Sequence, residues 1–344
     1  MSTVCDSVDE REATATLIRL VNGYQVSQAI HVAAELGIAD LLADGERSSD
    51  DLAQQAGADA DTLYRLLRAL ASVGVLHEDD SRRFSLTPVG ERLRSDVPGS
   101  LHGWAVFVGQ PTLWQVWSSL LYSVRTGENA FRHVHGQDIW SYRAERPEES
   151  LIFDAAMKAR TGESNAALLE AFDFSRFGTL VDVGGGNGAL LASVLATQPA
   201  LQGVLFDQAH VVAGAEPVLE AAGVADRCRI ESGSFFEKVP EGGDAYLLKW
   251  IIHDWEDEDS IAILRVVRAA MSGDARLLVV ERDLGSPNED PPTKFTDLTM
   301  LVAPGGRERT EDEYAALFES AGFRLVGGTR TTQELVVFEG EPVY

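Results

Sequence analysis

From Thr179 onward, short apolar segments alternate with segments of helical periodicity. This alternation predicts a parallel sheet whose strands are joined by helical crossovers. The last two segments could pair as a hairpin across Thr329–Gln333. An α/β fold with a seven-stranded sheet is therefore expected. Its candidate strands are Thr179–Val183, Gly203–Phe206, Arg229–Ser232, Ala245–Trp250, Arg276–Val280, Arg324–Gly328 and Glu334–Phe338.

The first hundred residues differ, because their apolar residues recur at helical spacing. Ser49 and Asp59 are placed to cap two of the expected helices. Two short segments, Val75–His77 and Arg83–Leu86, flank an acidic turn and predict a two-stranded wing. A mainly helical winged-helix domain is therefore expected at residues 1–100.

Winged helices occur in DNA-binding proteins and in dimerisation domains. The net charge of the domain helps to distinguish these two classes. Residues 1–100 contain nine Lys and Arg against seventeen Asp and Glu, and the whole chain has a formal net charge of −25. A field of this sign repels phosphate backbones and anionic lipid, so neither nucleic acid nor a membrane is an expected partner. A DNA-binding regulator that senses a metabolite stays an alternative because of one possible basic patch, made of Arg65, Arg68, Arg82 and Arg83.

Residues 101–172 are expected to form a helical connector, followed by a catalytic domain at 173–344. The connector holds four of the six tryptophans, and each could line a pocket or pack between domains or subunits. These residues are Trp104, Trp114, Trp117 and Trp140.

Cysteine usage and the N-terminus bear on the compartment. Neither Cys5 nor Cys228 has neighbours that suggest a metal site or a disulfide framework. The N-terminus is polar and acidic, without the basic start and apolar run of a signal peptide, and no segment is long enough to span a bilayer. A cytoplasmic protein is therefore expected.

The segment Asp182–Gly188 (DVGGGNG) runs directly from a candidate strand into a helix. Its glycines allow a tight turn and a close approach of the backbone to a ligand. Asp207 ends the next strand, where its carboxylate can accept hydrogen bonds from two ribose hydroxyls. A turn that binds pyrophosphate usually reads G-x-G-x-x-G, whereas this spacing suits a nucleoside without phosphate. The sequence thus predicts a nucleoside site through Gly184, Gly186 and Asp207.

Several motifs together resemble those of the S-adenosylmethionine (SAM)-dependent small-molecule O-methyltransferases, both plant phenolic and bacterial polyketide-tailoring enzymes. Besides the glycine turn they are Gly233–Phe236 (GSFF), Leu248–Trp255 (LKWIIHDW), Glu281 and Gly305–Thr310 (GGRERT). The resemblance implies a Rossmann-like catalytic domain that binds SAM. It also implies an N-terminal winged-helix domain that forms a homodimer.

The same resemblance implies which residues bind the cofactor. Phe235 would stack on the adenine, and Lys249 would lie near the cofactor. Ser234 stands where family members usually have an acid that contacts the adenine amino group, and a neutral acceptor is generally weaker than a charged one. The expected cofactor residues are Asp182, Gly184, Gly186, Asp207, Ser234, Phe235 and Lys249.

His253 is the expected general base. Free phenols titrate near pH 10, so a neutral imidazole within hydrogen-bond reach can take the proton as the methyl group moves. His253 follows a candidate strand at the carboxyl edge of the sheet, where open α/β sheets bind ligands. Glu281 ends the adjacent candidate strand, and its carboxylate or that of Glu308 could reach the other ring nitrogen. Methylation of a phenolic hydroxyl of a small aromatic, polyketide-type molecule is therefore expected.

For the acceptor pocket, Met157 and Met300 resemble family positions that clamp a flat ring, and Phe153 or Trp104 could add walls. Methionines also fill ordinary cores, which is the competing explanation. The acids of Asp254–Asp259 are expected to begin a helix, so no metal site is expected. A relative that binds SAM but hydroxylates or decarboxylates an aromatic polyketide stays an alternative.

Overall fold

The computed structural model describes residues 10–343, which form two compact units. The first contains the described residues up to Trp114 together with Arg146–Arg160, and the second contains Gln115–Glu145 and the residues from Thr161 onward. The expected domain boundaries at residues 100 and 172 stay a prediction. Cys5 lies outside the described residues, and Cys228 is a free cysteine.

The N-terminal part of the first unit is mainly helical, as expected, and ends in a small sheet. Asp59 caps α5 by accepting a hydrogen bond from the Thr62 amide. The expectation for Ser49 was wrong, because Ser48 accepts the amide hydrogen bond of Asp51 and caps α4. The helices are α1 (Glu10–Val21), α2 (Gly23–Glu35), α3 (Ile38–Leu41), α4 (Ser49–Ala56) and α5 (Ala60–Ser72).

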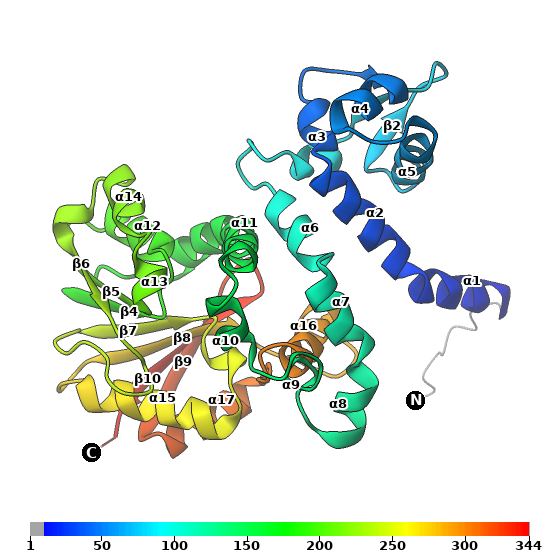
Figure 1. Ribbon diagram of the computed structural model, residues 1–344. Coiled ribbons are helices and arrows are strands. Elements are labelled where there is room, and N and C mark those ends of the chain that lie inside the picture. Colours follow the sequence, from blue (N-terminus) through cyan, green and yellow to red (C-terminus); the bar gives the residue numbers. More distant parts are fainter. Residues whose placement is uncertain (1–9, 344) are drawn as a thin grey trace, which may run out of the picture. The chain divides into compact units, whose positions relative to one another are not determined.

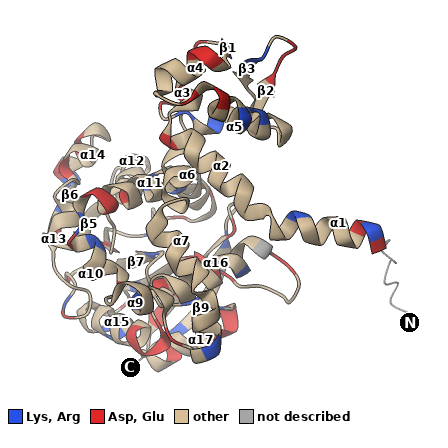
Figure 2. Cartoon of the chain, turned by 45° about the vertical axis from the view of Figure 1, so that its right-hand side comes forward, with Lys and Arg blue, Asp and Glu red and all other residues tan. Residues whose placement is uncertain are grey.

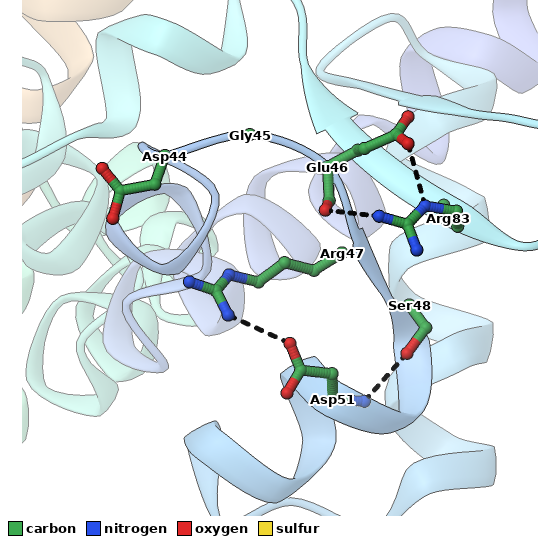
Figure 3. Close-up of a pocket in the computed structure, with 7 residues that line it drawn as sticks. All are labelled: Asp44, Gly45, Glu46, Arg47, Ser48, Asp51 and Arg83. Carbon is green, nitrogen blue, oxygen red and sulfur yellow. Dashed lines mark hydrogen bonds and ion pairs between the residues drawn. The ribbon is translucent and has the colours of Figure 1, made fainter.

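The wing has three strands rather than two, in the order β1-β3-β2. The expected pair is β2 (Leu76–Glu78) and β3 (Arg83–Leu86), and the two-residue β1 (Arg47–Ser48) adds to the edge of β3. Side-chain contacts hold this addition in place, since Arg83 pairs with Glu46 and Arg47 with Asp51 (Figure 3). These polar residues line an open cleft of about 390 Å³, in which both arginines already have carboxylate partners.

The connector is helical, as expected, and its short helices continue into one long helix. None of the helices described in the structure is both long and apolar enough to cross a bilayer. A short 3₁₀ turn, η1 (Gly90–Leu93), precedes the connector. The helices of the connector are α6 (His102–Val108), α7 (Pro111–Ser118), α8 (Leu120–Thr126), α9 (Ala130–His135), α10 (Ile139–Ala144) and α11 (Pro147–Ala171).

The second unit contains the expected seven-stranded sheet, in the order β6-β5-β4-β7-β8-β10-β9. The first five strands in this order are parallel, and β9 and β10 form the expected antiparallel hairpin at the edge. The α/β fold class is confirmed. The strands are β4 (Thr179–Val183), β5 (Gln202–Asp207), β6 (Cys228–Ser232), β7 (Ala245–Lys249), β8 (Arg276–Arg282), β9 (Phe323–Arg330) and β10 (Leu335–Pro342).

Helices cover both faces of this sheet. The central strands have apolar side chains pointing to each face, and both sets must be buried. On one face, Leu180 and Leu247 pack with α12 (Ala189–Thr197), α13 (Ala209–Val212) and α14 (Glu216–Ala221). On the other face, Val181 and Leu248 pack with α15 (Asp257–Ala270) and α17 (Glu311–Ser320). Figure 1 shows these two helical layers on either side of the strands. The remaining elements of this unit are η2 (Ala225–Arg227), η3 (Ile252–Asp254) and α16 (Pro291–Val302).

Candidate active site

The glycine turn follows β4 and leads into α12, at the carboxyl edge of the sheet. Gly184 and Gly186 have φ angles of 73° and 63°, in the left-handed region that favours glycine. A Cβ atom on Gly184 would lie 2.4 Å from Cδ1 of Ile251, whereas one on Gly186 would meet no atom within 4 Å. The same Cβ on Gly184 would lie 3.7 Å from the Phe235 ring. Phe235 and Ile251 therefore pack close to the turn at Gly184, whereas the backbone at Gly186 is open.

Asp207 is tied to this turn through one of its carboxylate oxygens. Its Oδ2 accepts a hydrogen bond from the amide of Gly186 at 2.9 Å, and its Oδ1 accepts one from the amide of Gln208 at 2.6 Å. Burial raises the pKa of Asp207, although these two amide hydrogen bonds act in the opposite direction. The structure thus brings together the glycine turn and the carboxylate that the sequence predicts for a ribose.

Asp182 and Lys249 lie near the carboxyl ends of the adjacent strands β4 and β7. Asp182 is buried, and its Oδ2 has no hydrogen-bond donor among the residues that the structure describes. Burial raises the pKa of Asp182 to about 7, against the opposing effect of the Lys249 charge. Lys249 donates to Oγ of Ser164 and Oδ1 of Asn165, each at 3.1 Å. Sequence patterns do not reveal these two α11 residues, because nothing local marks a contact across more than eighty positions.

The expected cofactor residues fit a nucleoside that carries an amino-acid end. The open backbone at Gly186 and the partly buried Phe235 ring suit a flat base, and the unpartnered oxygen of Asp182 beside Lys249 suits a charged polar group. Ser234 is half-buried, and its Oγ accepts a hydrogen bond from the Phe236 amide at 3.3 Å. The hydroxyl therefore already caps its own turn, whatever else it binds.

His253 lies on a short 3₁₀ turn, η3, rather than directly after a strand. The expected strand Ala245–Trp250 ends one residue earlier, at Lys249. Trp250 has a φ of 56°, a conformation that is costly for a bulky residue, and it redirects the chain into the turn. His253 itself is buried.

Two glutamates from distant segments meet at one nitrogen of this imidazole. Nδ1 of His253 lies 2.9 Å from Oε1 of Glu308 and 3.4 Å from Oε2 of Glu281. Glu281, near the end of β8, also accepts hydrogen bonds from the amides of Ile251 and His253 through Oε1. The hydrogen bond to Glu308 places the proton on Nδ1 and leaves Nε2 as the nitrogen that can accept another.

The charges of this cluster determine its protonation. Burial disfavours the imidazolium, but the carboxylates of Glu281, Glu308 and Asp254 outweigh burial and raise the pKa of His253 to about 10. Burial also raises the pKa of Glu281 to about 7, although the charge of His253 opposes this. The cluster therefore holds protons tightly, and Nε2 becomes free as the pH rises.

Among the described residues, His253, Glu281 and Glu308 also form a group that could hold a metal ion. One ligand atom from each of His253, Glu281 and Glu308 lies within 4.8 Å of the others. Imidazole and carboxylate suit several divalent metals. A proton shared between Nδ1 and Glu308 accounts for the same distances, so the expected absence of a metal stays a prediction.

Asp254 was expected among the acids that begin a helix, but the helix α15 starts only at Asp257. Asp254 belongs to the histidine turn, and its Oδ1 lies 3.6 Å from Nε2 of His253. Burial raises the pKa of Asp254 to about 6, against the opposing charges of His253 and Arg143. Sequence reasoning missed this third carboxylate, although its position next to His253 was a usable signal.

Arg309 is another residue whose role the sequence did not reveal. It is 1% exposed and donates to the carbonyl oxygens of Ile252 and Trp255, at 3.2 and 2.9 Å. It also makes two hydrogen bonds to Oδ1 of Asp257, at 2.9 and 2.8 Å. Arg309 thus holds both ends of the turn that carries His253.

The four expected acceptor residues divide between the two units. Trp104 and Phe153 belong to the first unit with Met157, and both rings contact Phe107 at centroid distances of 5.8 and 5.6 Å. Met300 belongs to the second unit, on α16, and all four are half-buried. Their joint contribution to one pocket stays a prediction.

The basic residues considered for DNA binding lie on the first unit together with acids. Arg68 and Arg82 lie over the ring of Tyr64, at 5.4 and 4.9 Å from its centroid. Figure 2 shows basic residues on α5 and acidic residues on α4, so this unit presents both signs of charge.

Comparisons with known proteins show which family the chain belongs to. Residues 117–324 match the O-methyltransferase domain, and residues 18–96 match the O-methyltransferase dimerisation domain. The chain is 41% identical over 330 residues to the phenazine O-methyltransferase PhzM of Lysobacter antibioticus, with 96% of each protein covered. It is 45% identical over 339 residues to the O-demethylpuromycin-O-methyltransferase of Streptomyces alboniger, covering 96% of this chain and 90% of that protein.

Solved structures show the same fold over nearly all of the chain. The crystal structure of LaPhzM matches with a TM-score of 0.92 at 41% identity, covering 96% of this chain and 99% of that one. The calicheamicin biosynthesis methyltransferase CalO1, solved in its SAH-bound form, matches with a TM-score of 0.85 at 35% identity, covering 98% and 100%. Since the domain match spans more than half of the chain and these relatives align along nearly all of it, the chain belongs to the SAM-dependent O-methyltransferases.

Proposed function

We propose that this methyltransferase transfers a methyl group from SAM to a phenolic hydroxyl of a small aromatic natural product, with His253 as general base. The observation that carries the proposal is the hydrogen bond between Nδ1 of His253 and Glu308, because it makes Nε2 the nitrogen that accepts the acceptor's proton once His253 is neutral. The expected homodimer, formed through the dimerisation domain, is part of the same proposal.

The cluster around His253 supports the choice of a phenol. A group with a pKa of about 10 exchanges a proton with a phenol at little cost, because free phenols titrate in the same range. When bound, SAM supplies an electrophilic methyl group on a sulfonium cation, and this positive charge opposes protonation of His253.

In the proposed reaction the acceptor O–H donates a hydrogen bond to Nε2 of His253. As the oxygen gains the methyl group, its proton passes to Nε2, and the electron pair of the broken carbon–sulfur bond stays on sulfur. Glu308 and Glu281 stabilise the imidazolium that forms and hold the ring in one orientation. The proton then leaves to solvent.

The named relatives favour an aromatic acceptor. They include a mitomycin biosynthesis 6-O-methyltransferase, a 3-amino-4-hydroxybenzoate 4-O-methyltransferase and a 2,7-dihydroxy-5-methyl-1-naphthoate 7-O-methyltransferase. Two other relatives are N-methyltransferases, so the family match alone does not decide which atom is methylated. Oxygen is the proposed atom because removal of an O–H proton gives the general base a role, and the three carboxylates around His253 raise the pKa of that base.

Replacing His253 with alanine tests the base. Turnover with a phenolic acceptor should fall by about 10²–10⁴-fold, because proton removal at the oxygen is lost. The affinity for SAM, measured by calorimetry, should change little, since the glycine turn and Asp207 remain. Turnover is measured with and without a chelator.

Three results would contradict parts of this proposal. Full turnover in His253→Ala removes the base assignment, and loss of turnover in chelator alone assigns a metal to the cluster instead. Consumption of the acceptor with incorporated oxygen or released carbon dioxide, and no methylated product by mass spectrometry, would favour hydroxylation or decarboxylation.

A further inference from the structure

Two almost fully buried arginines in the sheet-containing unit differ in their partners. Arg309 is saturated by carbonyl and carboxylate oxygens. Arg282 is 7% exposed, yet its buried Nε has no acceptor, and its guanidinium forms no hydrogen bond or ion pair with the rest of the described chain. Arginines are almost never fully buried unless paired, so Arg282 points to an anion that binds there.

Arg282 is placed where a ligand can reach it. It is the last residue of β8, at the carboxyl edge of the sheet, where ligands of open α/β sheets bind. Successive side chains of a strand point to opposite faces, so Arg282 faces away from Glu281 and the histidine cluster. It lies on the face of Lys249, the last residue of the neighbouring strand β7.

Both cations meet at one indole ring. Nζ of Lys249 lies 3.8 Å from the centroid of the Trp250 ring, and Cζ of Arg282 lies 5.9 Å from it. Nε1 of Trp250 is itself buried, and the described residues offer it no acceptor. The Trp250 ring therefore has two positive charges near it, and its own N–H lacks an acceptor among the described residues.

We propose that Arg282, the Trp250 indole N–H and Lys249 form a carboxylate-binding subsite. A guanidinium can grip a carboxylate with two parallel hydrogen bonds, and the indole can add a third. The proposal rests on the family membership, because two carboxylates can reach this edge: the α-carboxylate of SAM, or one on the aromatic acceptor. The unpartnered Oδ2 of Asp182, one strand beyond Lys249, favours SAM, whose carboxylate stands beside an ammonium group.

The test compares SAM with decarboxylated SAM, which keeps the sulfonium and the ammonium. In Arg282→Met the Kd for SAM, measured by calorimetry, should rise about tenfold to a hundredfold, as expected for a lost charge-assisted hydrogen bond. The Kd for decarboxylated SAM should not change. Arg282→Lys keeps the positive charge but lacks the two parallel N–H donors of the guanidinium. It should recover part of the affinity for SAM, which separates a lost contact from a misfolded variant.

The matched control is Arg276→Met at the other end of β8, where Arg276 pairs with Glu339 at 3.4 Å. It should bind both forms of SAM as the wild type does. A second arm compares 3-amino-4-hydroxybenzoate with its carboxamide, at saturating S-adenosylhomocysteine. A weaker Kd for SAM alone assigns the cofactor's carboxylate, and a weaker Kd for the benzoate alone assigns the acceptor's.

Unchanged affinities of Arg282→Met for all four ligands overturn the proposal. Wild-type protein that binds neither form of SAM contradicts the proposed function instead. The comparison of 3-amino-4-hydroxybenzoate with its carboxamide, repeated without S-adenosylhomocysteine, then decides the subsite by itself.

Discussion

His253 is held through one ring nitrogen and surrounded by three buried or nearly buried carboxylates. Glu308 and Glu281 lie at Nδ1, and Asp254 lies 3.6 Å from Nε2. Each negative charge favours the imidazolium, so the basicity of His253 depends on how many of them remain. This dependence gives the cluster a signature in the pH profile.

Replacing Glu308 with glutamine should move the pH dependence of kcat/KM to lower pH. Glu308 raises the pKa of His253, so Nε2 of the wild type stays protonated to higher pH and activity rises late. Without that charge the pKa of His253 falls, and the rise in activity begins at lower pH, although the maximum is reduced by poorer orientation of the ring. The profile is measured under steady-state conditions in both proteins.

The control for this prediction is Glu311→Gln, an exposed acid three positions along the chain that pairs with Arg330. It should leave the profile unchanged. An inflection at the same pH in wild type and Glu308→Gln would show that Glu308 does not act on the base.

Among the elements, η3 is held in its conformation by the loop that carries Gly306 and Arg309. Arg309 binds the carbonyl oxygens on either side of His253 and Asp254, and its own carbonyl accepts from the Leu284 amide just beyond β8. Gly306 fits against the turn so closely that a Cβ there would lie 2.1 Å from the carbonyl oxygen of His253. The loop thus ties the base to the strand that carries Glu281.

Arg309→Met should lower the free energy of unfolding by about 2–4 kcal/mol, because it removes the charge-assisted hydrogen bonds that a buried guanidinium makes to the carbonyl oxygens of Ile252 and Trp255 and to Asp257. Arg307→Met is the matched control: Arg307 is half-exposed, pairs with Glu256, and should cost less than about 1 kcal/mol. Both values come from urea unfolding. Equal stabilities of the two variants would show that Arg309 is not needed to hold the turn.

At the scale of the whole molecule, the first helix exposes an apolar surface that a single chain leaves uncovered. Leu17, Ile18, Leu20 and Val21 of α1 are each more than half exposed. Most of them fall within the segment that matches the dimerisation domain. Exposed apolar residues that cluster on one helix mark an interaction site.

Leu17→Asp should shift the protein from dimer towards monomer, because a charge would have to be buried in the interface. Light scattering after size-exclusion chromatography measures the mass. Ala15→Asp, which changes an exposed residue on the other side of α1, should leave the mass unchanged. A wild type that is monomeric at all concentrations would contradict the proposed homodimer.

The sequence by itself determined the features that depend on local pattern. The apolar segments gave the strands to within a few residues, the glycines located the turn after β4, and Asp59 capped its helix as expected. His253, Glu281 and Glu308 could be named from motifs, since motifs are local too. These signals survive folding because they act over a few neighbouring residues.

Only the tertiary structure decided which side chains meet across long separations. Lys249 donates hydrogen bonds to Ser164 and Asn165, and Arg309 donates one to the carbonyl oxygen of Ile252. No sequence pattern predicts either contact. Whether a buried charge finds a partner also depends on packing, which satisfies Arg309 and leaves Arg282 unpaired among the described residues. The physical reason is that desolvation and hydrogen bonding depend on where side chains lie in space, and local spacing does not record it.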